Sequence, residues 1–274
     1  MVVNLKKARD FVFSSGVLWE RDLFAYHFGG DLSRVHPSLR AHRNTDGGYG
    51  NALEHDIRCS QSNPLALEFL LTVLLQNDLP ASDLLDTTSA WCEANRNPDG
   101  SFKNPPEVLD YPHAPWWNEG GQSIPDSITG LLIRYGKASD DLRRSTAAWV
   151  AQNLTPDHIR ANDWLFMAYH AYDYFTHETN APNAAESRRL AIENIVALAA
   201  TEPERRYHSF FRFAPTPDSP VALAMPPDLL NRMVDYLYTT QQEDGGWVDE
   251  HNLAQWRAYV TITNLLVLRR FNRL

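Results

Sequence analysis

The chain has 274 residues and a formal net charge of −9, from 34 acidic and 25 basic side chains. This balance argues against a nucleic-acid partner and against binding to an anionic membrane, because both attract basic surfaces. The hydrophobic fraction of 43% allows a large core, and two cysteines are too few for a disulfide framework or a zinc site. The sequence has no apolar run of roughly 18 residues and no secretion signal after Met1, so we expect no transmembrane segment and a cytoplasmic location.

The order of apolar and capping residues predicts a helical chain. Ala and Leu far outnumber Val and Ile, which favours helix over strand. Asn63-Pro64, Ser139-Asp140 and Pro226-Pro227-Asp228 are typical helix starts. In chain order, we expect helices over 65–75, 87–95, 124–135, 139–149, 186–195, 233–241 and 253–270. The segments 65–75 and 253–270 are apolar on more than one face and are therefore predicted to be buried, whereas 139–149 and 186–195 carry more charge.

Three segments share one pattern: a polar residue, any residue, Asp, Gly, a small residue and an aromatic residue. They are 44–49, 97–102 and 242–247, and their aspartates lie 53 and 145 residues apart. Asp followed by Gly predicts a tight turn, because Asp bonds its own backbone and Gly accepts a positive φ. We expect Tyr49, Phe102 and Trp247 to pack as plugs behind these turns. Fainter copies at 153–157 and 201–204 would complete a repeat of about 50 residues.

Helices in pairs with a fixed period predict a solenoid or a closed ring. The contrast between buried and charged helices favours an inner ring inside an outer ring. We therefore predict an all-α protein with a single domain over residues 1–274, an α/α toroid of about five or six helical hairpins. The segment 205–228 holds five prolines where an inner helix is expected, so that unit is predicted to be broken or incomplete.

The turn motifs resemble those of a known superfamily. The pattern Tyr238-x3-Gln242-x2-Gly245-x-Trp247 resembles the QW motif of squalene–hopene and oxidosqualene cyclases. The run 44–50 resembles the Asp-Gly-Gly-Phe-Gly repeats of protein prenyltransferase β subunits. The resemblance implies an α/α toroid that handles an isoprenoid in an aromatic-lined central cavity. The Asp-x-Asp-Asp acid motif and the Asp-Asp-x-x-Asp metal motif of these enzymes are absent, and 56–59 has the wrong spacing for the prenyltransferase zinc ligands.

Carboxylates, histidines and aromatic residues recur after the turns, where the mouth of such a ring would lie. We expect Asp56, beside His55, to be the proton donor, with Asp126 or Asp163 as the alternative. His170 is more readily explained as a hydrogen-bonded core residue, and Glu68, on an apolar helix, needs a buried partner such as Arg58 or Arg134. The residues expected to bind substrate are Glu54, Arg58, Trp116, Trp117, Glu119, Trp164, Tyr169, Trp256, Arg257 and Tyr259.

Three functions fit these residues. The first is an isoprenoid-handling enzyme, with a proton-initiated terpene cyclisation as the specific hypothesis and aromatic faces that stabilise a carbocation. This function needs no cofactor, and Mg²⁺ only if the substrate is a diphosphate. The second is a carbohydrate-active α/α barrel, in which Glu54 or Asp56 pairs with Glu119 or Asp126. The third is a non-catalytic ligand-binding or scaffold protein. The sequence leaves the oligomeric state open.

Overall fold

The computed structural model describes residues 3–117 and 122–274, in which the regular elements are helices and one short pair of antiparallel strands. The predicted all-α class is confirmed. The chain divides into two compact units. Unit 1 is Met1–Ser38, Asp163–Phe166 and Ile192–Leu274, and unit 2 is Leu39–Asn162 and Met167–Ala191. The single closed ring of hairpins stays a prediction.

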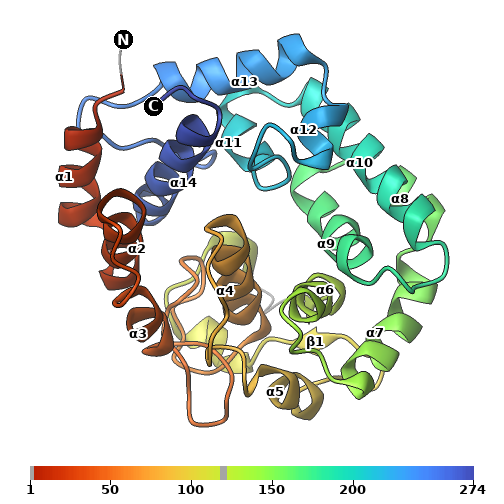
Figure 1. Ribbon diagram of the computed structural model, residues 1–274. Coiled ribbons are helices and arrows are strands. Elements are labelled where there is room, and N and C mark those ends of the chain that lie inside the picture. Colours follow the sequence, from red (N-terminus) through yellow and green to blue (C-terminus); the bar gives the residue numbers. More distant parts are fainter. Residues whose placement is uncertain (1–2, 118–121) are drawn as a thin grey trace. The chain divides into compact units, whose positions relative to one another are not determined.

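The elements follow one another along the chain as Figure 1 colours them. The first are α1 (Leu5–Ser15), α2 (Leu18–Gly29), α3 (Val35–Arg40), α4 (Pro64–Gln76), α5 (Thr88–Ala94), β1 (Phe102–Lys103), η1 (Pro106–Asp110), η2 (Pro115–Trp117) and β2 (Gln122–Ser123). The middle of the chain forms α6 (Asp126–Arg134), α7 (Asp140–Asn153), α8 (Pro156–Ala161), η3 (Leu165–Ala168), α9 (Tyr169–His177) and α10 (Ala184–Thr201). The last are η4 (Glu204–Arg206), α11 (Tyr207–Phe210), α12 (Pro220–Ala224), α13 (Pro227–Thr239), η5 (Ala254–Trp256) and α14 (Arg257–Arg270).

Unit 2 is built around the buried helix α4 and the pair α6 and α9. Asn63 caps α4, because its side-chain oxygen accepts the Ala66 backbone N–H at 2.8 Å. Gly130 allows α6 and α9 to pack closely. A Cβ at this position would lie 2.7 Å from the Asp173 carbonyl oxygen and 2.8 Å from the Tyr174 Cα. The missing side chain therefore sets the distance between the two helices that carry the candidate site.

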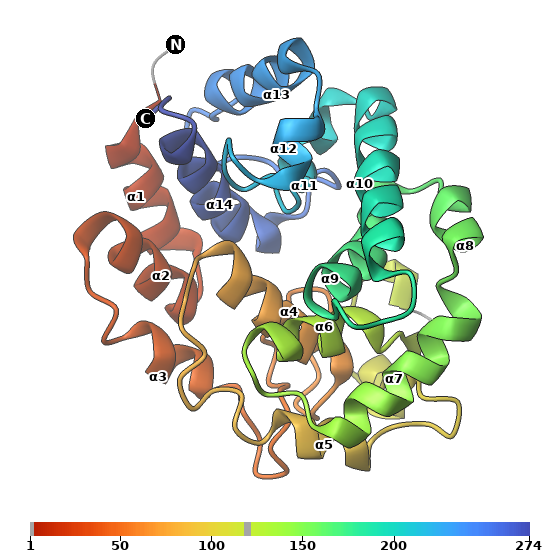
Figure 2. The same ribbon diagram turned by 45° about the vertical axis from the view of Figure 1, so that its right-hand side comes forward.

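Unit 1 has α14 as its buried helix. Figure 2 shows α14 between α1 and α13, and these helices pack against one another. Most of α14 from Ala258 to Leu268 is buried, as the apolar pattern over 253–270 predicts. That segment begins with the 3-10 turn η5, and α-helix starts only at Arg257. Trp19 of α2 packs edge-on against Tyr259, with ring centroids 5.6 Å apart.

The three Asp-Gly turns have the same backbone geometry. In each, the first residue donates to the carbonyl of the residue four positions on, and the glycine N–H donates back to the first residue, at 2.8–3.1 Å. Gly47, Gly100 and Gly245 have φ of 89°, 90° and 96°, which only glycine adopts without strain. Tyr49, Phe102 and Trp247 are 0–2% exposed. The predicted turns and aromatic plugs are therefore confirmed.

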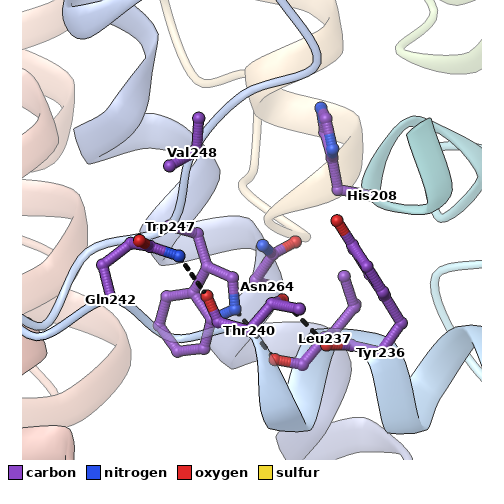
Figure 3. Close-up of a pocket in the computed structure, with 8 residues that line it drawn as sticks. All are labelled: His208, Tyr236, Leu237, Thr240, Gln242, Trp247, Val248 and Asn264. Carbon is purple, nitrogen blue, oxygen red and sulfur yellow. Dashed lines mark hydrogen bonds between the residues drawn. The ribbon is translucent and has the colours of Figure 1, made fainter. Parts of the chain in front are cut away.

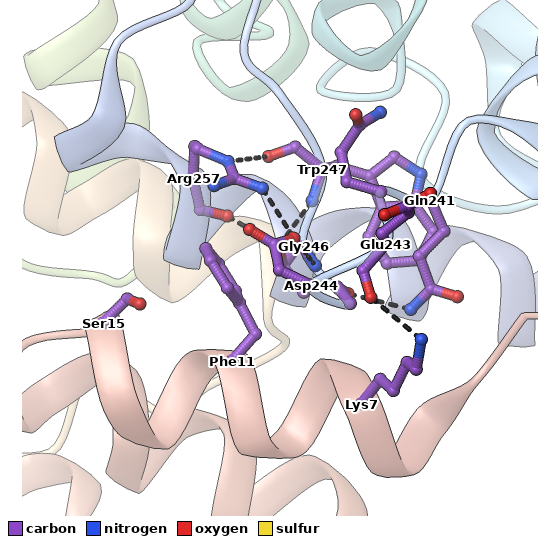
Figure 4. A network of polar contacts seen from close by, with 12 residues as sticks. Lys7, Phe11, Ser15, Gln241, Glu243, Asp244, Gly246, Trp247 and Arg257 are labelled. Carbon is purple, nitrogen blue, oxygen red and sulfur yellow. Dashed lines mark hydrogen bonds and ion pairs between the residues drawn. The ribbon is translucent and has the colours of Figure 1, made fainter.

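The third turn is braced by side chains from two other elements (Figure 4). Arg257 of α14 donates to Asp244 at 2.9 Å and to the Trp247 carbonyl at 3.2 Å, and its guanidinium lies 4.5 Å from the centre of the Phe11 ring. The Lys7 ammonium donates to the Glu243 carbonyl at 2.9 Å. The turn thereby joins α1, α13 and α14 of unit 1.

The two faint copies of the motif form different structures. At 153–157, Thr155 caps the short helix α8, and its hydroxyl accepts the His158 backbone N–H. At 201–204, α10 ends and η4 follows. Neither copy contains the glycine that the tight turn requires. Between η4 and α13, the proline-rich segment 205–228 forms the short helices α11 and α12 and no long helix. Whether a unit of a ring is incomplete here stays a prediction.

Candidate functional site

A buried polar pair of unit 2 joins α6 to α9. The Nδ1 of His170 lies 2.7 Å from the Oδ1 of Asp126, and the two side chains are 6% and 0% exposed. Asp126 is the first residue of α6, where the helix dipole favours a negative charge. Since a carboxylate only accepts, this contact fixes the imidazole proton on Nδ1.

The buried Oδ2 of Asp126 has no hydrogen-bond partner among the described residues. The contact with Asp126 uses the Nδ1 of His170 and does not involve its Nε2. A histidine held at Nδ1 by a carboxylate can give or take a proton at Nε2. The contact with Asp126 therefore holds the imidazole of His170 at Nδ1, and Nε2 is the nitrogen that can transfer a proton.

Residues next to this pair extend it into a polar cluster. The Tyr169 ring lies against the His170 ring with centroids 4.0 Å apart, and its hydroxyl donates to Glu68 of α4 at 2.9 Å. The Ser127 hydroxyl donates to Asp173 at 2.8 Å. We call Glu68, Asp126, Ser127, Tyr169, His170 and Asp173 the acid–histidine cluster, and all six are buried.

The loop before α4 supplies a second group of acids. The Oε2 of Glu54 accepts the backbone N–H groups of Asp56 at 2.7 Å and Ile57 at 3.0 Å. The half-buried Asp56 accepts the indole N–H of Trp116 at 3.2 Å. His55 is buried, and its ring centroid lies 6.0 Å from that of Phe69 in α4. The loop therefore places Glu54, His55 and Asp56 beside the helix that carries Glu68.

Burial and charge shift the proton affinity of two groups here. Burial raises the pKa of Glu54 well above its usual value, and the charges of Asp56 and Glu68 add to this, against the two backbone N–H groups that lower it. Burial alone would lower the pKa of His170, but the charge and hydrogen bond of Asp126, with Glu68 and Asp173, raise it overall. Glu54 and His170 are thus both coupled to Glu68, and both favour the protonated form.

The remaining predicted residues of unit 2 lie at its surface, against a small core cluster or outside the described residues. Arg58 is exposed, and it is Tyr169 that bonds Glu68. Trp116 is 51% exposed. Trp117 packs against the small core cluster of Ile57, Cys59 and Val108. Glu119 lies outside the residues that the structure describes.

Five predicted residues belong to unit 1. Asp163 is exposed, and Trp164 is 45% exposed with its ring against Phe166. Arg257 braces the third turn, and Tyr259 packs between Trp19 and Trp256. Their part in substrate binding stays a prediction.

Four residues of the cluster were not among the predicted site residues: Glu68, Ser127, His170 and Asp173. Glu68 was noticeable in the sequence as the acid in an otherwise apolar helix. His170 carried no comparable signal, since one histidine among aromatic residues is typical of a core. Only the approach of α6 to α9 at Gly130 brings His170 to Asp126.

The described part of the chain holds no group of three or more His, Cys, Asp or Glu arranged to bind a metal ion. None of the described helices is both long and apolar enough to cross a membrane. The chain matches no known protein-family model, and no curated protein is significantly similar to it.

Proposed function

We propose that unit 2 carries an acid–base site that transfers protons to or from a neutral small molecule, and that this molecule is an isoprenoid. The observation that carries the proposal is the buried Asp126–His170 pair, in which one imidazole nitrogen is anchored and the other is not part of the contact. A buried carboxylate oxygen without a hydrogen-bond partner destabilises the folded state, which argues against a role for the pair in stability alone.

Each residue has a role in this proposal. His170, held by Asp126, moves the proton at Nε2. Glu54 is a neutral acid because burial keeps its pKa high, and it replaces Asp56 as the first candidate for the proton donor. Tyr169 positions the imidazole through its ring and, by bonding Glu68, keeps that carboxylate in place.

The charge of the site favours a neutral substrate. Four of its side chains are carboxylic groups from α4, α6, α9 and the loop before α4: Glu54, Glu68, Asp126 and Asp173. Such a site disfavours a diphosphate, so squalene-like hydrocarbons are preferred over prenyl diphosphates. The choice of an isoprenoid rests on the resemblance of the turns and on the aromatic rings of Phe69, Trp116 and Tyr169 beside the acids.

One observation favours a second function, action on a carbohydrate. Trp116 is 51% exposed while its indole N–H is bonded to Asp56, so a fixed aromatic face lies beside a carboxylate. Exposed tryptophan faces stack on sugar rings, and a protonated acid such as Glu54 would act on the glycosidic oxygen.

The test incubates the wild-type protein and the variants Asp126→Asn and His170→Gln with squalene, farnesyl diphosphate and geranylgeranyl diphosphate, with and without Mg²⁺. Products are detected by mass spectrometry and binding by thermal shift. We expect a product from squalene and a loss of about 10²–10⁴-fold in its rate in both variants. The exposed Asp157→Asn serves as the matched control and should retain full activity.

Lack of both product and thermal shift with all three isoprenoids would refute the proposal. A thermal shift with oligosaccharides, lost on Trp116→Ala, would replace it with the second function.

A further inference from the structure

Unit 1 contains a cavity that is independent of the acid–histidine cluster. It lies among α11, α13, the third turn and α14, and with its open mouth it measures about 270 Å³. Figure 3 shows the side chains around it, with Val248 and His208 on one side and Asn264 of α14 facing them. This volume includes space that is open to solvent, so only a small molecule would fit inside the cavity.

Asn264 is the residue that the fold leaves unexplained. It is 2% exposed, and between Val260 and Leu268 the other residues of its helix are apolar except Thr261 and Thr263. Among the described residues, its side-chain amide makes no hydrogen bond, although it has two donors and an acceptor. Such a group costs about 1–3 kcal/mol when nothing satisfies it. It lies in the wall of a cavity that is open to solvent, where a bound molecule can pair with the amide.

Several polar groups of the cavity wall already form hydrogen bonds within the protein, so those groups are not available to a ligand. The Trp247 indole N–H donates to the Leu237 carbonyl at 2.8 Å, and the Thr240 hydroxyl donates to the Tyr236 carbonyl at 2.8 Å. The Gln242 amide nitrogen donates to the Thr240 carbonyl at 2.8 Å. These bonds hold the wall rigid.

The groups left for a ligand are neutral. They are the Asn264 amide, the Tyr236 hydroxyl, the Gln242 amide oxygen and the His208 ring. Burial lowers the pKa of His208 to about 4, against the charge of Asp249 and a bond to the Arg205 backbone that raise it, so the ring is uncharged at neutral pH. A wall of neutral donors and acceptors disfavours an ion and favours a molecule with both kinds of group.

We propose that this cavity binds a small, neutral, planar molecule with an amide or lactam edge, of the size of a pyrimidine base. A side-chain amide pairs with such an edge through one donor and one acceptor at once, as asparagine does with base edges. The third turn supplies Gln242, Trp247 and Val248 to this site, so a turn that braces the unit also forms a wall of the cavity.

The test uses uracil as the probe and 1,3-dimethyluracil as its matched control, because methylation removes both N–H donors from the edge. Binding is measured by ligand-observed NMR and by titration calorimetry on the full-length protein. We expect uracil to bind, and dimethyluracil to bind at least 10-fold more weakly.

Two variants locate the site. Asn264→Leu removes the amide at nearly constant volume, and Val248→Trp fills the mouth from a position that is 37% exposed. Both should weaken uracil binding at least 10-fold, and Leu223→Trp, at a position that is 72% exposed and outside the cavity, should leave it unchanged. If Asn264→Leu does not fold, the effect of Val248→Trp on uracil binding tests the location of the site.

Absence of uracil binding to the wild-type protein would overturn the proposal, as would binding that Val248→Trp leaves unchanged. Neither result bears on the acid–base site, whose residues all belong to unit 2.

Discussion

At the scale of single residues, burial and neighbouring charges together shift the pKa of both His170 and Glu54 upward. Both groups are at least nine-tenths buried, and both favour the protonated form for physical reasons that differ. Neighbouring carboxylates raise the pKa of His170 against the effect of burial, whereas burial itself raises that of Glu54. The substitutions Asp126→Asn and Glu54→Gln test these two causes separately.

Asp126→Asn should lower the pKa of His170, because it removes the charge that opposes burial. In the wild type, the stabilisation from protonated His170 is complete below its unfolded pKa of about 6.5 and is lost as pH rises through the raised folded pKa. NMR titration of the imidazole and unfolding at a series of pH values measure both effects. Asp157→Asn is the control, and an unchanged His170 pKa in Asp126→Asn would contradict this account.

Glu54→Gln should make stability less dependent on pH. Because the folded pKa of Glu54 is raised, its favourable contribution is complete below the unfolded pKa of about 4.3 and is lost as pH rises through the folded pKa. The glutamine oxygen still accepts the Asp56 and Ile57 N–H groups without carrying a charge. Urea unfolding at pH 5 and pH 8 measures this. The free energy of unfolding of the variant, relative to that of the wild type, should be higher at pH 8 than at pH 5. A difference that is the same at both pH values would refute this.

At the scale of elements, the absence of a Cβ in glycine allows helices and turns to approach closely at two positions. Gly130 sets the approach of α6 to α9, and Gly245 sets that of the third turn to α1, where a Cβ would lie 2.3 Å from the Lys7 carbonyl carbon. The repeat pattern predicted the turn glycines from the sequence. Nothing in the sequence marked Gly130, because an isolated glycine in a helix has no fixed meaning without its neighbour.

Gly130→Ala should destabilise unit 2 by about 1–3 kcal/mol, because the methyl group would meet the backbone at Asp173 and Tyr174. It should also disturb the His170–Asp126 contact between the same helices. Gly29→Ala is the control: its Cβ meets nothing within 4 Å, so that variant should be neutral or slightly more stable. Chemical denaturation measures both, and equal stabilities would contradict the packing argument.

Gly245→Ala should cost more stability than Gly100→Ala. Both residues have φ near +90°, so both substitutions pay the strain of about 1–2 kcal/mol for a left-handed backbone. At Gly100 the nearest atom is the Ser145 hydroxyl at 3.3 Å, whereas at Gly245 it is backbone that cannot move aside. Thermal unfolding measures the loss of stability in both variants. A larger loss in Gly100→Ala than in Gly245→Ala would show that the backbone of α1 can move to accommodate a Cβ at position 245.

At the scale of the whole molecule, the two units are each assembled from separate parts of the chain. Unit 2 consists of Leu39–Asn162 and Met167–Ala191, and the second part carries α9 with its His170 and Asp173. The core of unit 2 therefore depends on a segment that is synthesised after the first part is complete.

A fragment of residues 39–162 should accordingly fail to fold cooperatively, because α6 would lack the helix that covers it at Gly130. A fragment of residues 39–191, which includes α9, should regain helix content and a cooperative thermal transition. Circular dichroism during heating distinguishes them. A cooperative transition in the shorter fragment would show that α9 is dispensable to the core.

Local sequence patterns are enough to predict the helical class, the buried helices and the three Asp-Gly turns, because apolar spacing, caps and glycine conformations act over a few residues. They also indicated Glu54, His55, Asp56 and Asp126 as groups worth attention. Three contacts depend on the folded chain: Asp126 with His170, Tyr169 with Glu68, and Asn264 with the wall of a cavity. Those pairings join residues from different elements, up to 101 positions apart, and their distances are set by how helices pack rather than by any local pattern.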